Sequence, residues 1–307
     1  MKIVNLIPRK GVTRPHQRDA IVSVENAWQQ GITRAQVIMP GGSGKTFVGM
    51  KVIEKRLGVE DGVVVVCVPT LTLLEQTLRA YKIYMEEDAL DWENDVLCVG
   101  SKMSFEDVKL TTKREHVEAF CGEGGRKLIL ATYQSAVDCL RGTEIDLLVL
   151  DEAHFAGGGG VYSSILDDKE INAKRRVFMT ATPKARNDVK DLYGEIVYNL
   201  SYNEAIERNI TAPIRLIAHK LKNASQVPEV PGHNTFDRER EREWKAKVLV
   251  DACETFGLRK VIAFSRTNQR AKELTAKLGE QDAFRLNLLV NGTVNEKVRE
   301  DIIISAF

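Results

Sequence analysis

The sequence predicts an α/β protein with a parallel sheet covered by helices on both faces. Short apolar runs rich in valine alternate with longer amphipathic stretches, which is the pattern of buried parallel strands joined by helices. The chain has 307 residues, which suggests about two domains of ~150 residues. Its 43% hydrophobic and 28% charged residues are ordinary for a globular protein and exclude a wholly disordered chain.

The first half of the chain carries the clearest alternation of strand and helix. Buried strands are predicted at 35–39, 63–68, 127–131, 146–150 and 175–179. Helices are predicted over roughly 15–30, 44–57, 71–83 and 132–140. In the first of these helices Ile21, Val24 and Trp28 share one face, and Gly31 is a typical C-terminal stop. This order favours a parallel sheet with crossover helices.

The second half repeats the pattern after a looser stretch from about 184 to 213. We expect strands at 214–219, 260–264 and 284–290, helices at about 243–256 and 268–278, and an exposed excursion at 223–243. That excursion holds two prolines and the charge run DRERERE. A boundary near 205–213 divides the chain into domains 1–207 and 208–307.

Charge and cysteine content narrow the class of protein only a little. The net charge of +1 excludes a globally basic nucleic-acid-binding protein, although a local basic stripe stays compatible with it. The five cysteines are dispersed, without a CxxC pair, and this predicts reduced thiols in a cytoplasmic or nuclear compartment. No run approaches the ~18 apolar residues of a membrane helix, and the N-terminus lacks the features of a secretory signal. We therefore expect no membrane partner.

The strongest chemical signal is PGGSGKT at 40–46, between a predicted strand and a predicted helix. Glycines there let backbone N–H groups approach an anion, and the helix N-terminus favours negative charge. Lys45, which we expect to be an exposed loop lysine without nucleotide, would reach the β- and γ-phosphates of ATP, and Thr46 would hold Mg²⁺. The pattern GxxxxGK[ST] is incomplete because Met39 stands at its first glycine. The alternative is a glycine-rich turn with a surface lysine. The cofactor-binding residues predicted from this run are Gly41, Gly42, Ser43, Gly44, Lys45 and Thr46.

A second signal, LLVLDEAH at 147–154, puts two carboxylates at the carboxyl end of a buried strand. Ligand sites of α/β sheets gather at this edge. Asp151 suits a ligand of Mg²⁺, and Glu152 suits a base that orients water. The alternative is a solvated acidic turn, which becomes less convincing beside the upstream phosphate loop.

These two motifs and TATP at 180–183 together resemble motifs I, II and III of superfamily 2 helicases and translocases. Other segments resemble further parts of that family in the same order: RPHQRDAI at 14–21, PTLTLLEQT at 69–77, ATYQS at 131–135, YNEAIERNI at 202–210 and VIAFSRTNQRAKEL at 261–274. The resemblance covers nearly the whole chain. Within the superfamily it is strongest to the type III restriction subunit group.

The resemblance implies a RecA-like P-loop NTPase domain followed by a second, incomplete RecA-like domain. It implies that Lys45, Thr46, Asp151 and Glu152 bind and hydrolyse MgATP, and that Gln17 reads adenine. His154, Thr180 and Thr182 would couple the ATP site to the nucleic-acid track, where Thr70 and Thr132 would contact backbone phosphates. Such contacts read no bases, so binding would tolerate many sequences. DNA is favoured over RNA by the subgroup resemblance alone.

The sequence departs from the family at its C-terminal end. A motif of the form QxxGRxxR, which brings arginines to the γ-phosphate, is absent from these residues, and we expect a fragment whose missing motifs come from further domains or subunits. The leading hypothesis is an ATP-dependent nucleic-acid motor. Alternatives are a module that binds ATP or nucleic acid without turnover and, less well matched, another P-loop enzyme such as a small kinase. An ATPase assay with and without DNA separates the first two.

Overall fold

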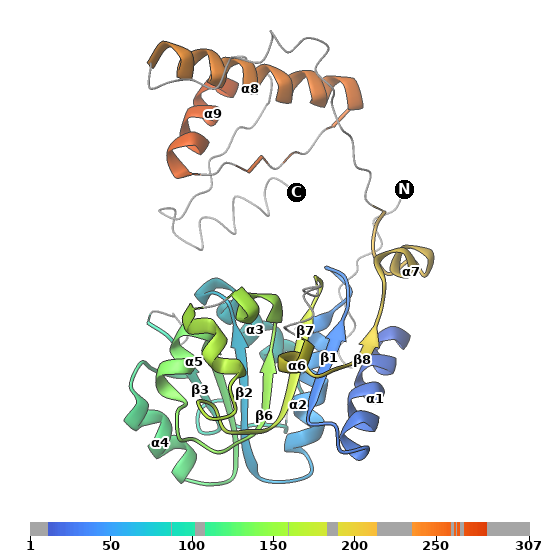
Figure 1. The fold of residues 1–307 in the computed structure, drawn as a ribbon, viewed down its shortest axis with the longest axis vertical. Helices are drawn as coiled ribbons and strands as arrows, with labels where there is room; N and C mark the ends of the chain where they lie inside the picture. The colour runs from blue at the N-terminus through green and yellow to red at the C-terminus, as the bar shows by residue number, and fades with distance from the viewer. Residues whose placement is uncertain are drawn as a thin grey trace. The chain divides into compact units, whose positions relative to one another are not determined.

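The computed structural model describes residues 12–86, 88–101, 108–158, 160–182, 190–213, 235–258, 261, 263–264 and 267–280. The chain divides into two compact units, Met1–Ile214 and Arg215–Phe307. In the first unit the described strands form one sheet with helices packed against it (Figure 1). In the described part of the second unit, helix α8 (Thr235–Phe256) contacts helix α9 (Asn268–Glu280), where Arg242 Nη2 lies 2.9 Å from Glu273 Oε1. None of the described helices is long and apolar enough to cross a membrane.

The sheet of the first unit has eight strands in the order β4-β3-β5-β2-β6-β7-β1-β8. Every neighbouring pair is parallel. The strands are β1 Arg34–Ile38, β2 Gly62–Val68, β3 Val96–Val99, β4 Lys109–Thr111, β5 Arg126–Thr132, β6 Ile145–Leu150, β7 Ala173–Thr180 and β8 Glu195–Asn199. The predicted α/β class with a parallel sheet is confirmed, and the five strands predicted for this half lie within a residue or two of their expected places.

Helices cover both faces of this sheet, because alternate strand residues point to opposite faces. Val64 and Val66 of β2 belong to one buried apolar cluster, whereas Val65 and Cys67 belong to the other. The first cluster includes residues of α1 (Pro15–Gln29), α2 (Lys45–Leu57) and α3 (Leu71–Tyr84). The second includes residues of α4 (Arg114–Gly122), α5 (Tyr133–Cys139) and two short 3₁₀ helices, η1 (Ala153–Gly158) and η2 (Gly160–Leu166). Burial on both faces is the reason the strands are so uniformly apolar.

The sequence pattern missed the two edge strands, β4 and β8, the four-residue strand β3 beside β4, and several short helices. Strand β8 pairs with β1, but none of its five side chains is fully buried, and its apolar run is only three residues long, from Ile196 to Tyr198. Strand β4 has only three residues, two of them exposed. The stretch expected to loosen from 184 to 213 contains α6 (Lys190–Tyr193), β8 and α7 (Tyr202–Glu207). Edge strands bury few side chains and so lack an apolar pattern, whereas β3 is fully buried but only four residues long.

Two expectations for the second half need correction. Helix α8 begins at Thr235 rather than near 243, so the charge run DRERERE lies in the first turns of a helix. Of the strand expected at 260–264, the described residues Val261, Ala263 and Phe264 are not in a strand. The strands expected at 214–219 and 284–290 lie outside the described residues.

Asp146 joins four elements at the amino end of the sheet. Its carboxylate accepts a hydrogen bond from Val63 N (2.9 Å) and forms ion pairs with Lys174 Nζ (2.9 Å) and Arg56 Nη2 (3.2 Å). Burial alone would raise the pKa of Asp146, but the hydrogen bonds from Lys174 and Val63 and the charges of Lys174 and Arg56 outweigh it and lower that pKa. The ionised carboxylate is therefore favoured in the folded protein.

We expect Asp146→Asn to lower the free energy of unfolding at pH 7 by about 2 kcal/mol, because charge-assisted bonds to Lys174 and Arg56 are lost. A carboxyl whose pKa is lowered by folding stabilises the protein above its unfolded pKa, about 3.9. That contribution disappears as the pH falls through the lower folded pKa, so parent and variant converge there. Urea titrations at pH 7 and below pH 4 measure both effects. The exposed Asp138→Asn is the control, and an equal loss at both pH values would contradict the linkage.

Candidate functional site

The residues predicted from the phosphate-loop, acidic and TATP motifs lie at the carboxyl edge of three adjacent strands, β1, β7 and β6. The phosphate-loop run leads from β1 into α2, the acidic run follows β6, and Thr180 ends β7. Parallel strands end at a common edge, so residues distant in sequence meet there. The structure thus brings together Lys45, Thr46, Asp151, Glu152, His154 and Thr180.

The loop at 40–46 is held in shape by glycine conformations and by helix α1. Gly42 and Gly44 have φ values of 76° and 91°, which side chains rarely adopt. A Cβ on Gly44 would lie 2.3 Å from Gln17 Nε2, so a larger residue there would also displace the Gln17 side chain. Ser43 is fully buried, and its Oγ donates to Pro40 O at 2.7 Å. The exposed Gly41 and Gly42 leave the outer side of the loop open.

Two side chains of α1 hold the Ser43 carbonyl. Gln17 Nε2 donates to Ser43 O at 3.3 Å, and Gln17 Oε1 accepts from Arg14 N at 2.9 Å. His16 Nε2 lies 2.9 Å from the same oxygen, so this nitrogen carries the proton. Burial lowers the pKa of His16, which favours the neutral ring. These bonds use one N–H and one lone pair of the Gln17 amide, which has a second of each, and adenine recognition by Gln17 stays a prediction. Sequence reasoning missed His16, although it neighbours Gln17.

Lys45 is buried rather than exposed, which corrects the expectation of an exposed loop lysine. Its side chain is 8% exposed, and Nζ lies 3.8 Å from Glu152 Oε1. Lys45 is also the first residue of α2, so its charge sits at the helix N-terminus. An anion that entered the loop would compete with Glu152 for this ammonium group.

Thr46 and Asp151 present two adjacent oxygens. Thr46 Oγ1 donates to Asp151 Oδ2 at 3.3 Å. Burial, followed by the negative charge of Glu152, raises the pKa of Asp151, and Lys45 and Thr46 act in the opposite direction. A cation between the two oxygens would relieve this unfavourable burial of negative charge. Magnesium commonly takes one or two protein oxygens and completes its shell with phosphates and water, so these residues fit it.

Glu152 occupies an unusual backbone conformation in the turn after β6. Its φ is 50°, and its N–H donates to Asp151 Oδ1 at 2.9 Å. The side chain is 31% exposed, so water can reach the carboxylate. A non-glycine residue keeps a positive φ only where the surrounding structure holds it, and such residues cluster at functional sites.

His154 joins the end of β6 to the end of β7. Its Nδ1 lies 3.1 Å from Thr180 Oγ1 and 3.4 Å from Glu152 Oε2. Thr182 N donates to Thr180 Oγ1 at 3.1 Å, whereas the Thr182 side chain is exposed. The predicted coupling residues are therefore in contact through Thr180, and their coupling role stays a prediction.

Thr70 and Thr132 are the N-caps of α3 and α5, after the adjacent strands β2 and β5. Each hydroxyl accepts a backbone N–H, from Leu73 at 3.2 Å and from Ser135 at 3.3 Å. Thr132 is 7% exposed, and its hydroxyl also donates to Ser135 Oγ at 3.0 Å, while Thr70 is exposed. Of the two predicted phosphate contacts, Thr70 is the accessible one.

Two buried tyrosines that no motif singled out contact the turn containing Glu152. Tyr133 Oη donates to Asp151 O, and Tyr193 Oη donates to Ala153 O, each at 2.9 Å. Tyr133 lies inside the run ATYQS, whereas Tyr193 lies in a segment without any sequence signal.

Comparison with known proteins gives both a family and a fold. The family described as "Type III restriction enzyme, res subunit" matches residues 10–185, which is more than half of the chain. The chain is similar to the ATP-dependent Type ISP restriction-modification enzyme LlaBIII bound to DNA, with a TM-score of 0.71 and 18% identity over 97% of this chain and 23% of that one. It is also similar to a nuclease-deletion mutant of the Type ISP enzyme LlaGI in complex with a DNA substrate mimic, with a TM-score of 0.69 and 20% identity over 95% of this chain. This chain spans 23% of either enzyme, and at these identities the likeness shows a shared fold. No curated protein matches the sequence.

Proposed function

The chain belongs to the family of the type III restriction enzyme res subunit, and from this membership we propose that it is an ATP-dependent motor that translocates on nucleic acid, with DNA favoured over RNA. The family is one of helicase-like ATPase domains in superfamily 2, and the α/β fold with a parallel sheet is that of its RecA-like domains. The observation that carries the proposal is the meeting of Lys45, Thr46, Asp151 and Glu152 at one edge of the sheet.

We propose that the loop at 40–46 binds the ATP phosphates through its backbone N–H groups and through Lys45. The ammonium group of Lys45 neutralises phosphate charge after it leaves Glu152, 3.8 Å away. Thr46 and Asp151 would hold Mg²⁺, which supplies positive charge against the β- and γ-phosphates. Glu152, released from Lys45 and reachable by water, orients the attacking water and takes its proton.

The path from hydrolysis to nucleic acid is proposed to run through His154 and Thr180. His154 contacts Glu152 on one side and Thr180 on the other, so a shift of Glu152 reaches the segment at 180–182 directly. Thr70 is proposed as a backbone-phosphate contact on the same edge of the sheet. Of the structural neighbours, LlaBIII is bound to DNA and the LlaGI mutant is in complex with a DNA substrate mimic. This supports DNA as the track.

The rate of hydrolysis by residues 1–307 is proposed to be low. An arginine from outside the phosphate loop contributes about 10³–10⁵ in rate in related enzymes. The sequence of these residues contains no match to QxxGRxxR, so we propose that residues 1–307 hydrolyse MgATP slowly, with little stimulation by DNA. The second candidate function is a module that binds ATP without turnover, and it is favoured by the lack of a QxxGRxxR match in residues 1–307.

Binding to random single-stranded DNA tests the nucleic-acid part of the proposal. Phosphate contacts release counterions, so each contact adds about −0.7 to the slope of log K against log salt. With three such contacts we expect affinity to fall roughly 20-fold between 50 and 200 mM salt. Fluorescence anisotropy with two unrelated sequences and a matched RNA measures this. A flat salt response, or a strong preference for one sequence, would count against the motor track.

A further inference from the structure

The turn that carries Glu152 depends on its surroundings for its shape. Glu152 has a φ of 50°, which costs conformational free energy for any residue with a Cβ. Within the turn, Asp151 N donates to Cys67 O at 2.9 Å and Phe155 N donates to Glu152 O at 3.0 Å. These bonds leave the carbonyls of Asp151 and Ala153, on either side of Glu152, to be held by other groups.

Two tyrosine hydroxyls hold those carbonyls from two different elements. Tyr133, fully buried at the start of α5, donates to Asp151 O at 2.9 Å. Tyr193, 7% exposed at the end of α6, donates to Ala153 O at 2.9 Å. Burial raises the pKa of both hydroxyls, so each keeps the proton that it donates. The peptide units on both sides of Glu152 are thus fixed from the second apolar cluster.

Tyr193 is itself fixed by strand β1. Arg34 Nε and Nη2 donate to Leu192 O at 2.9 and 2.5 Å, and Gln36 Nε2 donates to Gly194 O at 2.7 Å. The residues before and after Tyr193 are therefore both anchored. Its ring also packs edge-on against Phe178 of β7, with centroids 5.1 Å apart.

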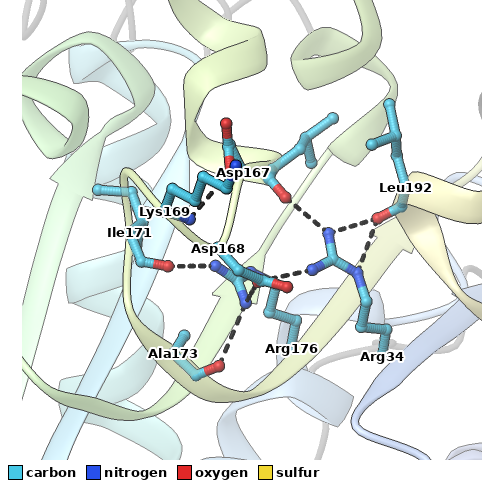
Figure 2. A network of polar contacts seen from close by, with 9 residues as sticks. Arg34, Asp167, Asp168, Lys169, Ile171, Ala173, Arg176 and Leu192 are labelled. Carbon is cyan, nitrogen blue, oxygen red and sulfur yellow. Dashed lines mark hydrogen bonds and ion pairs between the residues drawn. The ribbon is translucent and has the colours of Figure 1, made fainter.

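The anchor at Arg34 is part of a larger polar network at the amino end of β1 and β7. Figure 2 shows the Arg34 guanidinium between the Leu192 carbonyl and Asp168, with the buried Arg176 on the other side of that carboxylate. Arg34 Nη2 also donates to Leu166 O at 2.8 Å. The network ties the connections that precede and follow β7 to the strand that leads into the phosphate loop.

We propose that Tyr133 and Tyr193 are positioning residues that hold the Asp151–His154 turn in its active shape, with Glu152 aimed at the reacting water. The inference rests on the proposed ATPase function. Tyr193 lies in a different element from Tyr133, and its hydroxyl holds the carbonyl of Ala153, next to His154. A shift of α6 would therefore be transmitted to Glu152 through Ala153 O.

Tyr133→Phe, Tyr193→Phe and the double variant test the proposal, because phenylalanine keeps the ring and removes only the hydroxyl. The control is Thr111→Val in β4, which removes a buried hydroxyl that bonds Lys113 N and His116 Nδ1 at 3.0 Å each at a far edge of the sheet. In the 307-residue chain we expect single-turnover hydrolysis at saturating MgATP to fall about tenfold for each single variant, with Kd for MgATP within about twofold. Amide hydrogen exchange should accelerate in peptides covering 148–158 and nowhere else beyond the change in the control.

Rates and exchange equal to those of Thr111→Val would overturn the positioning role. A uniform loss of melting temperature and rate in all variants, control included, would also overturn it, because that is the result of lost stability alone. If the parent chain neither binds nor hydrolyses MgATP, the proposed function fails, and the exchange of peptides 148–158 still decides whether the two tyrosines hold the turn.

Discussion

Lys45→Ala is expected to weaken MgATP binding by about 2–3 kcal/mol, roughly 30- to 150-fold in Kd. The ammonium group is the side-chain cation of the phosphate loop, and a charge-assisted bond to phosphate in a buried setting has about this strength. Its effect on folding is expected to be small, since the ion pair that it makes with Glu152 is long, at 3.8 Å, and Glu152 is partly solvated. Titration with a fluorescent ATP analogue, together with a thermal melt, measures both.

Lys55→Ala is the matched control for this change. Lys55 lies in the same helix α2, is 54% exposed, and pairs with Glu25 at 2.6 Å on the surface. It removes the same charge from the same helix at a distance from the loop, so it reports any effect of net charge on nucleotide affinity. Equal affinities for the parent and Lys45→Ala would refute the assignment of this lysine to the phosphates.

The local sequence carried enough information for the central strands and for the loop between β1 and α2. Val64, Val65 and Val66 are buried on alternating faces, so their run identifies β2 without any tertiary information. Strand β8 could not be found this way, because it pairs with β1 through its backbone while three of its five side chains are exposed and none is fully buried. Backbone pairing between two strands forms only in the folded sheet, and it leaves no pattern of apolar side chains in the sequence.

The sequence motifs predicted the residues of the site, but not the residues that hold them in place. Lys45, Asp151 and Glu152 stand in recognisable runs, whereas the burial of Lys45 follows from packing that the run does not contain. Tyr193 reaches the turn only because Arg34 and Gln36 anchor its neighbours to β1. These contacts join segments about 160 residues apart in sequence. The sequence does not indicate that the two segments lie together in the fold. From sequence alone, Tyr193 is therefore an ordinary core tyrosine and Arg34 an ordinary surface arginine.

Glu152→Gln is expected to lower single-turnover hydrolysis by about 10²–10⁴ while leaving MgATP bound. Glutamine has the same shape and can hold a hydrogen bond to water, but it cannot take the proton that the attacking water must lose. The structure adds an expectation about affinity. In the free protein the Glu152 carboxylate pairs with Lys45 and so competes with the ATP phosphates for its ammonium group. The substitution neutralises Glu152, which frees Lys45 and removes a negative charge near the phosphates. We therefore expect MgATP to bind slightly more tightly to the variant than to the parent.

The two halves of this expectation can be checked on the same samples, by rapid-quench turnover and by equilibrium titration. Glu118→Gln is the control, since it neutralises an exposed carboxylate that pairs with Arg114 at 2.7 Å in α4. Loss of both binding and turnover in Glu152→Gln would mean that Glu152 shapes the nucleotide pocket rather than the reaction. Turnover at the parental rate would assign the base to another group and would leave the contact between Glu152 and His154 without a catalytic reason. Because the side chain keeps its size and the backbone its φ of 50°, the variant separates the chemistry of this carboxylate from the shape of the turn that holds it.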